Sequence, residues 1–204
     1  RELRVMLSFV YLSNRPGSID LLAKSFGEQS HQDYELVVVD GWPGRVERDK
    51  ARKYLLECGV KLGWYGPPKP RTFPQSVTGF ANAMNTGIIH AKGHWVVFVH
   101  DFTLLPPTVV RDWGNSIGEY PNALIHGVGF EYSTPPPIGQ DDVLTWGGRY
   151  VGWQFIRNWT PELFEVGYFC APISFFTKCN GIDERADFCS EWTYHWFLHQ
   201  AKQQ

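Results

Sequence analysis

Residues 95–107 read WVVFVHDFTLLPP, and this stretch is the clearest guide to the fold. Five apolar residues run from Trp95 to Val99, which predicts a strand that is buried on both faces. His100 and Asp101 follow directly, so a histidine and a carboxylate stand where the buried strand ends. The stretch therefore indicates either a ligand site or a strand end whose polar side chains form hydrogen bonds with nearby protein groups.

The residues before this stretch alternate between predicted strands and predicted helices. The strands are apolar throughout, and the helices carry apolar residues at helical spacing. The predicted strands cover residues 4–12, 34–39, 60–65 and 95–99, and the predicted helices cover residues 18–29, 46–58 and 78–91. This alternation is typical of a parallel sheet with helices on both faces. We therefore predict an α/β fold with a parallel sheet.

After residue 107 the pattern becomes less regular. The sequence there predicts a short helix at 108–117, a strand at 123–133, a long loop at 134–149, strand and turn at 168–184, and a helix at 190–202. We find no internal repeat, low-complexity tract or linker. The chain length suits one domain, so we predict a single domain over residues 1–204.

The charge balance excludes several classes of partner. The 204 residues carry 19 Lys plus Arg and 21 Asp plus Glu, for a net charge of -2. A surface for nucleic acid or anionic membranes needs clustered cations, so we expect neither partner. No apolar run approaches the roughly 20 residues that cross a bilayer, so we also expect no membrane span.

Cysteine and aromatic residues each allow two interpretations. The cysteines at positions 58, 170, 179 and 189 lack C-x-x-C spacing, and we interpret them as reduced thiols of a cytoplasmic protein. A disulfide in the second half of the chain is the alternative. Aromatic residues make up 16% of the chain, including nine tryptophans. They indicate either a large core or surfaces on which sugars or bases stack.

Polar side chains follow three of the predicted strands at the point where each strand ends. They are Ser13, Asn14 and Arg15 after the first strand, Asp40 after the second, and His100 and Asp101 after the fourth. In an open parallel α/β sheet, ligands bind beyond the carboxyl ends of the strands. Together, these side chains predict a binding site at that edge.

Each of these residues also has a local explanation. Asp40 could cap a turn, Asn14 could form an Asx turn, and His100 could be a hydrogen-bonded histidine. As a pair, a carboxylate beside an imidazole suits Mn²⁺ or Mg²⁺ bridging a diphosphate. No G-x-G-x-x-G follows the first strand and no G-x-x-x-x-G-K-[ST] occurs, which argues against a dinucleotide site and a P-loop.

Five stretches of the chain follow one another in an order that is typical of one protein family. SNRPGSIDLLAKSFGEQSHQDYELVVVD at 13–40 is similar to that family's opening, and ANAMNTGIIHAKGHWVVFVHDF at 81–102 to its central segment. LLPP at 104–107, NGIDE at 180–184 and CSEWTYHWFL at 189–198 resemble later family motifs. In this order they resemble the motifs of the GT-A glycosyltransferases of the inverting family 2 type, which implies a GT-A, Rossmann-like fold with a mixed, mainly parallel sheet and helices on both faces.

The resemblance also implies an activity and its ligands. The chain would move a sugar from a nucleotide-diphospho-sugar, usually a UDP-sugar, to an acceptor hydroxyl, assisted by Mn²⁺ or Mg²⁺ and with inversion. Residues 1–103 would form the nucleotide-sugar-binding half, and residues 104–204 the acceptor-binding and catalytic half. The acceptor would be a glycan, a lipid-linked compound or a small molecule, and further domains could follow the C-terminus.

Individual roles follow from the matched positions. Asp40 would bind the base, and the loop that contains Ser13, Asn14 and Arg15 would wall its pocket. His100 and Asp101 would hold the metal, and Asp101 would also hold the donor ribose and phosphates. Glu191 would take the proton of the acceptor hydroxyl, a role in which a positioned carboxylate is effective. The implied nucleotide-binding residues are thus Ser13, Asn14, Arg15, Asp40 and Asp101.

Two positions depart from the family pattern. The family's Asp-x-Asp is here His100, Asp101 and Phe102, and its Glu-Asp pair is Glu191-Trp192. These departures favour an alternative, a catalytically weak or inactive module of the same fold that binds sugar nucleotides or glycans. A nucleotidyltransferase is a third hypothesis, but it expects a Gly-rich, Arg-containing loop that SNRPG matches poorly.

Four further residues are candidates for contacts with the sugars. Trp146 and Trp153 flank a glycine-containing stretch, where their indoles could stack on the acceptor or pack in the core. Asp183 and Glu184, in the NGIDE turn, could contact the donor sugar or cap the last helix.

Overall fold

The structure of the 204-residue chain is a computed structural model. It describes residues 6–14, 17–42, 48–69, 79–101, 103–132, 150–155, 168–185 and 199, with residues 128–132 and 150–155 as backbone only. The described strands are β1 Leu7–Ser13, β2 Tyr34–Asp40, β3 Leu62–Gly66, β4 Trp95–His100, β5 Thr103–Leu104, β6 Ile125–Tyr132, β7 Tyr150–Phe155 and β8 Phe169–Pro172. The described helices are α1 Ile19–Gly27, α2 Arg48–Glu57, α3 Phe80–His90, α4 Val109–Glu119 and α5 Ile173–Lys178.

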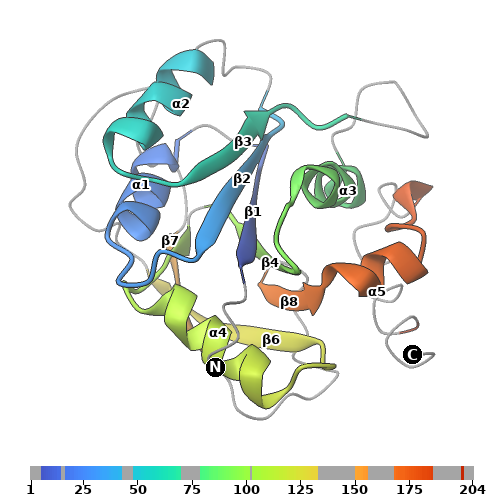
Figure 1. The fold of residues 1–204 in the computed structure, drawn as a ribbon. Coiled ribbons are helices and arrows are strands. Elements are labelled where there is room, and N and C mark those ends of the chain that lie inside the picture. The colour runs from blue at the N-terminus through green and yellow to red at the C-terminus, as the bar shows by residue number, and fades with distance from the viewer. Residues whose placement is uncertain are drawn as a thin grey trace.

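These strands form a mixed sheet in the order β3-β2-β1-β4-β8-β6-β7-β5 (Figure 1). The first four strands in this order are all parallel. β8 then runs antiparallel to both β4 and β6, and β6 runs antiparallel to β7. The prediction of an α/β fold with a mixed sheet is confirmed, and its parallel part is the half built from the first hundred residues.

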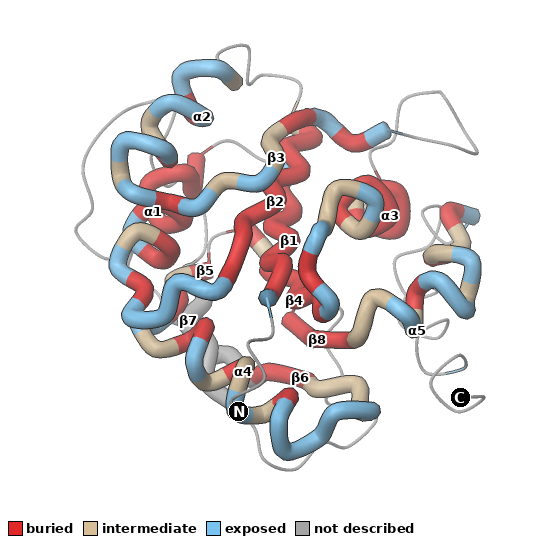
Figure 2. Tube along the Cα trace, in the orientation of Figure 1, coloured by how far each residue is buried: buried red, intermediate tan, exposed pale blue. Residues whose placement is uncertain are grey.

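Helices cover both faces of the sheet because its central strands are apolar on both sides (Figure 2). On one face, Phe9 and Leu36 belong to a core that also contains buried residues of α1, α2 and α4. On the other face, Val10 and Val37 pack in a second core with residues of α3 and α5. Consecutive residues of β1 and β2 therefore pack in different cores.

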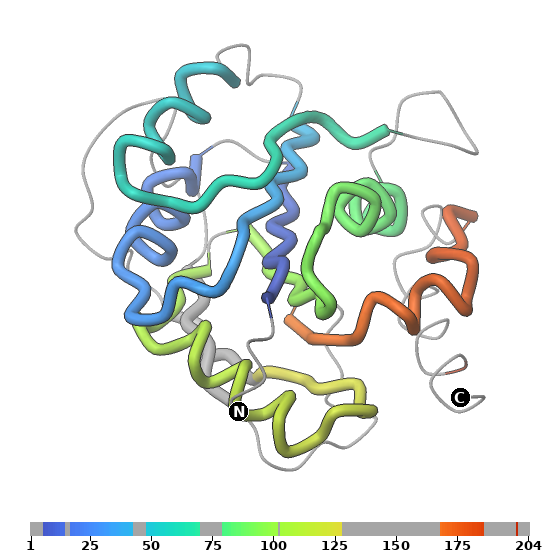
Figure 3. Tube along the Cα trace, viewed as in Figure 1, coloured from blue at the N-terminus to red at the C-terminus, as the bar shows by residue number. Residues whose placement is uncertain are grey.

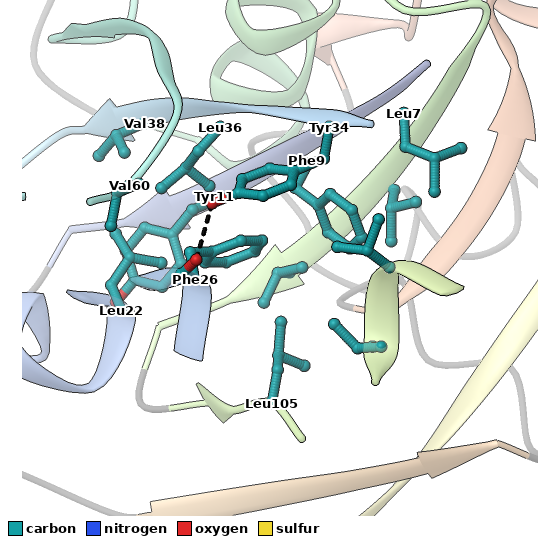
Figure 4. Close-up of a cluster of buried hydrophobic side chains, with 14 of the residues drawn as sticks. Leu7, Phe9, Tyr11, Leu22, Phe26, Tyr34, Leu36, Val38, Val60 and Leu105 are labelled. Atoms are coloured by element: carbon teal, nitrogen blue, oxygen red, sulfur yellow. Dashed lines mark hydrogen bonds between the residues drawn. The ribbon is translucent and has the colours of Figure 1, made fainter. Parts of the chain in front are cut away.

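Aromatic rings fill the core under α1 (Figure 4). The ring of Phe9 meets that of Phe26 edge-on at a centroid distance of 5.1 Å, and Tyr34 lies 5.5 Å from Phe26. The Tyr11 hydroxyl shares a hydrogen bond with Ser18 at the start of α1, and the Tyr34 hydroxyl donates to Phe26 O at 2.7 Å. In this described core, packing accounts for the aromatic residues, as the first of the two interpretations predicted.

Some predicted elements differ from the observed ones. Residues 173–178, predicted within a strand-and-turn segment, form helix α5, which is too short to show a helical apolar pattern. The short strands β5 and β7 were not predicted. Most of the predicted loop at 134–149 and helix at 190–202 lies outside the described residues.

Two further findings concern the described part of the chain. None of its helices has the length and apolar content to cross a membrane. The thiols of Cys58, Cys170 and Cys179 are free there, and Cys170 is fully buried.

Helix α3 packs very closely on β1, and Gly87 makes this possible. A Cβ atom at position 87 would overlap the Val10 side chain, whose atoms are fully buried. The close approach fixes α3 against the centre of the sheet, and the N-terminal end of this helix borders the pocket described below.

We expect Gly87→Ala to lower the free energy of unfolding by about 1–3 kcal/mol, because the added methyl group overpacks a filled core. Urea denaturation followed by circular dichroism measures this change. Gly114→Ala is the matched control, since nothing lies within 4 Å of a Cβ at this position in α4. There we expect a gain of up to about 1 kcal/mol from helix propensity. Equal effects at the two positions would contradict the packing argument.

Candidate functional site

A pocket of about 380 Å³ lies at the carboxyl edge of the parallel strands. Its wall combines the ends of β1 and β4, the residues that follow β2 and β3, and the first turns of α3. The lining residues are Leu12, Ser13, Asn14, Gly41, Pro68, Gly79, Phe80, Ala83, His100 and Asp101. The pocket therefore brings together Ser13, Asn14, His100 and Asp101, as the strand-end pattern predicted.

The strand ends meet because the parallel register holds them level. Ser13 pairs with Asp40 across β1 and β2, and Leu12 pairs with His100 across β1 and β4. Backbone hydrogen bonds continue the pairing beyond the strands, from Gly41 N to Ser13 O at 2.7 Å and from Asp101 N to Leu12 O at 3.0 Å. The backbone around the pocket is thus fixed by the sheet itself.

His100 and Asp101 contact different neighbours. The Asp101 carboxylate is almost fully buried, and its Oδ2 accepts a hydrogen bond from Ser13 Oγ at 3.3 Å. The His100 ring meets the Phe80 ring of α3 edge-on at 5.1 Å. The two side chains line one pocket but are oriented by separate elements, as expected for consecutive residues at a strand end.

Asp40 is fully buried and well supplied with hydrogen-bond donors. Its Oδ2 accepts from the Tyr65 hydroxyl of β3 at 2.6 Å, and its Oδ1 accepts from Trp42 N at 3.3 Å. Arg48 Nη2 donates to the backbone carbonyls of Asp40 and Trp42 at 3.5 and 3.2 Å. Asp40 itself does not line the pocket, although its chain neighbour Gly41 does.

Gln29, just beyond α1, fixes the segment that follows Asp101. Its Nε2 donates to Pro106 O at 2.9 Å, and its Oε1 accepts from Val110 N at 3.2 Å. Nearby, Leu105 N donates to Ser25 Oγ of α1 at 2.9 Å. Gln29 and Ser25 are both buried. Their hydrogen bonds therefore hold residues 105–110, which follow the strand that ends at the pocket, against α1.

The NGIDE turn is tied to α3 through Asn85. Asn85 Nδ2 donates to Ile182 O at 2.8 Å and to Glu184 Oε1 at 3.1 Å, and Ile182 N donates to Asn85 Oδ1 at 2.8 Å. Gly181 has a φ of 80°, a conformation that suits glycine. The late segment of the chain, drawn in orange in Figure 3, is thereby held beside α3.

Asp183 and Glu184 have different surroundings within this turn. Glu184 is buried against Asn85, whereas Asp183 pairs with the exposed Arg185 at 2.5 Å. Hydrogen bonds from Arg185 hold the pKa of the Asp183 carboxyl below its usual value. Neither residue is among those that line the pocket, so their contact with the donor sugar stays a prediction.

Several predicted site residues cannot be placed. Arg15, Trp146 and Glu191 lie outside the described residues, as does Phe102. Trp153 lies in β7, where the backbone alone is described. Their assigned roles stay predictions, as do the division of the chain at residues 103 and 104 and the cytoplasmic location.

Other functional candidates were missed in the sequence. Tyr65 stands near the end of the third predicted strand, so the strand-end pattern could have found it. Phe80 and Gln29 belong to regions without a local signal for a site, and their contacts join segments far apart in the chain.

The pocket offers two side chains that could bind a divalent cation, His100 and Asp101, which is fewer than a complete set of protein ligands. Within the described ranges, no group of three or more His, Cys, Asp or Glu side chains is arranged to hold a metal ion. Mg²⁺ and similar ions, however, are often held by one or two protein ligands, with water and substrate phosphates as the rest. His100 and Asp101 line the pocket, and they are the described side chains that would hold such an ion there.

The sequence model of glycosyl transferase family 2 matches residues 10–161, three quarters of the chain. The chain belongs to glycosyl transferase family 2. The resemblance seen in the sequence is therefore confirmed. No curated protein matches the chain.

Solved structures support the same fold. The chain is similar to S. aureus TarS residues 1–349, with a TM-score of 0.57 and 14% identity over 85% of this chain and 49% of that one. The UDP complex of the same fragment gives 0.59 at 13% identity over 90% and 52%, and its UDP-GlcNAc complex gives 0.53 at 13% over 85% and 47%. At this identity the likeness shows the GT-A fold alone. The chain spans about half the length of this TarS fragment.

We expect Gln29→Ala to lower the free energy of unfolding by about 2–4 kcal/mol, because Pro106 O and Val110 N lose a buried hydrogen-bond partner. Urea denaturation measures the loss. The control is Gln32→Ala, an exposed side chain that donates to Gln29 O and should change stability by less than about 0.5 kcal/mol. If Gln29→Ala lost no more stability than Gln32→Ala, the hydrogen bonds from Gln29 to Pro106 and Val110 would contribute little to the free energy of unfolding.

Proposed function

We propose that the chain transfers a sugar from a UDP-sugar to an acceptor hydroxyl by an inverting displacement assisted by Mn²⁺ or Mg²⁺. The observation that carries this proposal is the pocket at the carboxyl edge of the sheet, lined by Ser13, Asn14, His100 and Asp101 in a chain of glycosyl transferase family 2. Its volume falls in the range typical of small-molecule sites, about 300–1,000 Å³.

The choice of a UDP-linked donor draws support from the neighbouring structures. S. aureus TarS 1–349, which shares the fold, has been solved in complex with UDP and with UDP-GlcNAc. In this chain Asp40 receives the base, while Ser13, Asn14 and Arg15 form the wall around it. Asp101 binds the ribose and phosphates.

His100 and Asp101 are the side chains that would hold the cation. When bound, the ion supplies positive charge that stabilises the departing diphosphate. Ser13 Oγ keeps the Asp101 carboxylate on the pocket wall, and Phe80 keeps the His100 ring in place.

Glu191 is the proposed general base. Its carboxylate takes the proton of the acceptor hydroxyl as that oxygen bonds to the anomeric carbon and the bond to the diphosphate breaks. Trp146, Trp153, Asp183 and Glu184 are the proposed sugar contacts. The acceptor is a glycan, a lipid-linked compound or a small molecule.

A second candidate function is binding of sugar nucleotides or glycans without efficient transfer. The observation that favours it is Phe102 at the position of the family's second acidic residue, where it cannot bind a metal. Both candidate functions predict that the chain binds UDP, but only the first predicts efficient transfer of the sugar.

We expect Glu191→Gln to leave UDP affinity within about twofold of the parent chain and to abolish transfer, because the amide cannot accept the acceptor's proton. Calorimetry with UDP and a transfer assay measure the two quantities. Glu119→Gln, on the exposed end of α4, is the control and should keep both. Normal turnover by Glu191→Gln would disprove the base assignment, and absence of turnover in the parent chain would favour the binding module.

We expect Asp101→Ala to weaken UDP binding about tenfold or more in the presence of Mn²⁺, because the ion loses a protein ligand. Calorimetry with UDP, with and without Mn²⁺, tests this, and the exposed Asp49→Ala on α2 is the control. If Asp101→Ala kept the same gain from Mn²⁺ as the parent, the ion would have to bind elsewhere.

A further inference from the structure

The pocket has different chemistry at its two ends. Pro68, Phe80 and Ala83 form an apolar wall, which comes from the segment after β3 and from helix α3. The polar side chains of the lining come from the ends of β1 and β4 and from the residues directly after them. In the sheet order β3-β2-β1-β4, two strands separate the end of β3, which leads to Pro68, from His100 at the end of β4. The Pro68 end of the pocket is therefore apolar, and the His100 end is polar.

Pro68 belongs to the segment GPPK at 66–69, which is held at both of its ends. Gly66, the last residue of β3, pairs with β2, and Lys69 N donates a hydrogen bond to Thr86 Oγ1 of α3 at 2.9 Å. The two prolines between them have a fixed φ and no N–H of their own. Pro68 is buried, although Pro67 and Lys69 are exposed. The place of Pro68 in the pocket wall therefore depends on the two ends of this segment.

The Thr86 side chain is fixed within α3 and can hold the segment in one direction. It is 2% exposed, and its Oγ1 donates to Asn82 O, one turn earlier in the helix, at 3.0 Å. A hydroxyl that donates to one group still has lone pairs for a donor such as Lys69 N. The bond within the helix thus orients the oxygen that receives Lys69.

A second contact aligns the same part of the chain with α3. The Trp64 ring of β3 stacks on the His90 ring at a centroid distance of 4.0 Å and an interplanar angle of 10°. Ala83, Thr86 and His90 are spaced by three and four residues, so they lie on one face of the helix. From Trp64 to Lys69 the chain therefore follows this face of α3, and the Thr86 bond is its anchor on the side of the pocket.

We propose that Thr86 is a positioning residue for the donor nucleotide, because by holding Lys69 it sets Pro68 in the wall against which the base packs. The proposal rests on the proposed function, in which this pocket binds a UDP-sugar. It goes further in that it makes a residue outside the pocket lining responsible for part of the donor affinity.

The base is the part of the nucleotide that suits the Pro68 end of the pocket. A uracil ring has flat faces that can be buried against apolar side chains, whereas a diphosphate and its cation need polar partners. The proposed cation ligands, His100 and Asp101, belong to the β4 end. Pro68 therefore contacts the base, and displacement of Pro68 weakens every ligand that carries this base.

The test is calorimetry of UMP and UDP binding to the full 204-residue chain and to Thr86→Val. Valine keeps the size and branching of threonine and removes the hydroxyl, so Lys69 N loses its acceptor. We expect both nucleotides to bind about three- to tenfold more weakly, the value of roughly one hydrogen bond. Unchanged affinity for either nucleotide would overturn the proposal.

Two further measurements separate positioning from general loosening of the pocket. We expect Thr86→Ser, which keeps the hydroxyl, to bind both nucleotides within about twofold of the parent chain. We expect the gain in UDP affinity from Mn²⁺ to be the same in Thr86→Val as in the parent, because the proposed cation ligands belong to the other end of the pocket. Failure of serine to preserve binding, or a smaller gain from Mn²⁺ in Thr86→Val, would contradict the proposal.

Thr177→Val in α5 is the matched control. The Thr177 hydroxyl makes the same kind of bond, to Ile173 O one turn earlier at 3.1 Å, on an exposed part of the helix. We expect this variant to bind both nucleotides within about twofold of the parent chain. A fall like that of Thr86→Val would mean that removing any such hydroxyl lowers affinity, which would also overturn the proposal.

Hydrogen exchange provides a measurement on the unaltered chain. Because Lys69 is exposed, protection of its amide reports the bond to Thr86. We expect NMR to show that the Lys69 amide exchanges about tenfold more slowly than in an unstructured peptide, and that Thr86→Val speeds this exchange. Exchange of the parent's Lys69 amide at the rate of an unstructured peptide would contradict the proposal even if Thr86→Val did not fold.

The parent chain separates this proposal from the function on which it rests. If the parent bound neither UMP nor UDP, the nucleotide pocket would be wrongly assigned, and the Thr86 proposal would fail with it. If the parent bound UDP and Thr86→Val bound it equally well, the role of Thr86 alone would be wrong.

Discussion

The in-register pairing of β1 with β2 and β4 is the constraint on which the candidate site depends. It places Ser13 beside Asp40 and Leu12 beside His100, and it continues beyond the strands through Gly41 and Asp101. A slip of one residue in either pair would turn every side chain of that strand to the other face of the sheet. Two separate apolar cores oppose such a slip, since each accepts only one set of alternating residues.

The same alternation explains why His100 and Asp101 act as two separately supported groups. The Phe80 ring of α3 contacts the ring of His100. The Ser13 hydroxyl of β1 donates to the carboxylate of Asp101. A ligand held by both would bridge the two sides of the sheet edge, and α3 and β1 would both share in binding it. Because α3 packs tightly on β1 through Gly87, these two supports do not move independently.

Much of the fold follows from local sequence patterns. Continuous apolar runs such as Trp95–Val99 indicate strands buried on both faces, and their alternation with helices predicts a parallel sheet. The shared edge of a parallel sheet then predicts that the polar residues at the strand ends meet, which Ser13, His100 and Asp101 do. The order of the family motifs along the chain added the prediction of a GT-A architecture.

The strand-end pattern could have found Tyr65, but no sequence pattern predicts the individual contacts that hold the site together. Tyr65 meets Asp40 across 25 residues, Gln29 meets Pro106 across 77, and Asn85 meets Ile182 across 97. No periodicity in the chain encodes such pairs, because each depends on how whole elements pack. Helix α5 was missed for a related reason, since its six residues are too few to show a period.

The links at Gln29 and Asn85 also bear on how the family can diversify. Gln29 fixes the chain where it leaves the pocket at residues 105–110, and Asn85 fixes it again at Ile182. The stretch between these two anchors is a closed loop in the topological sense, and the entropy of closing such a loop grows only with the logarithm of its length. Longer connections between α4, β6, β7 and β8 within this stretch therefore cost little in chain entropy, whereas changes in the strands themselves would disturb the sheet.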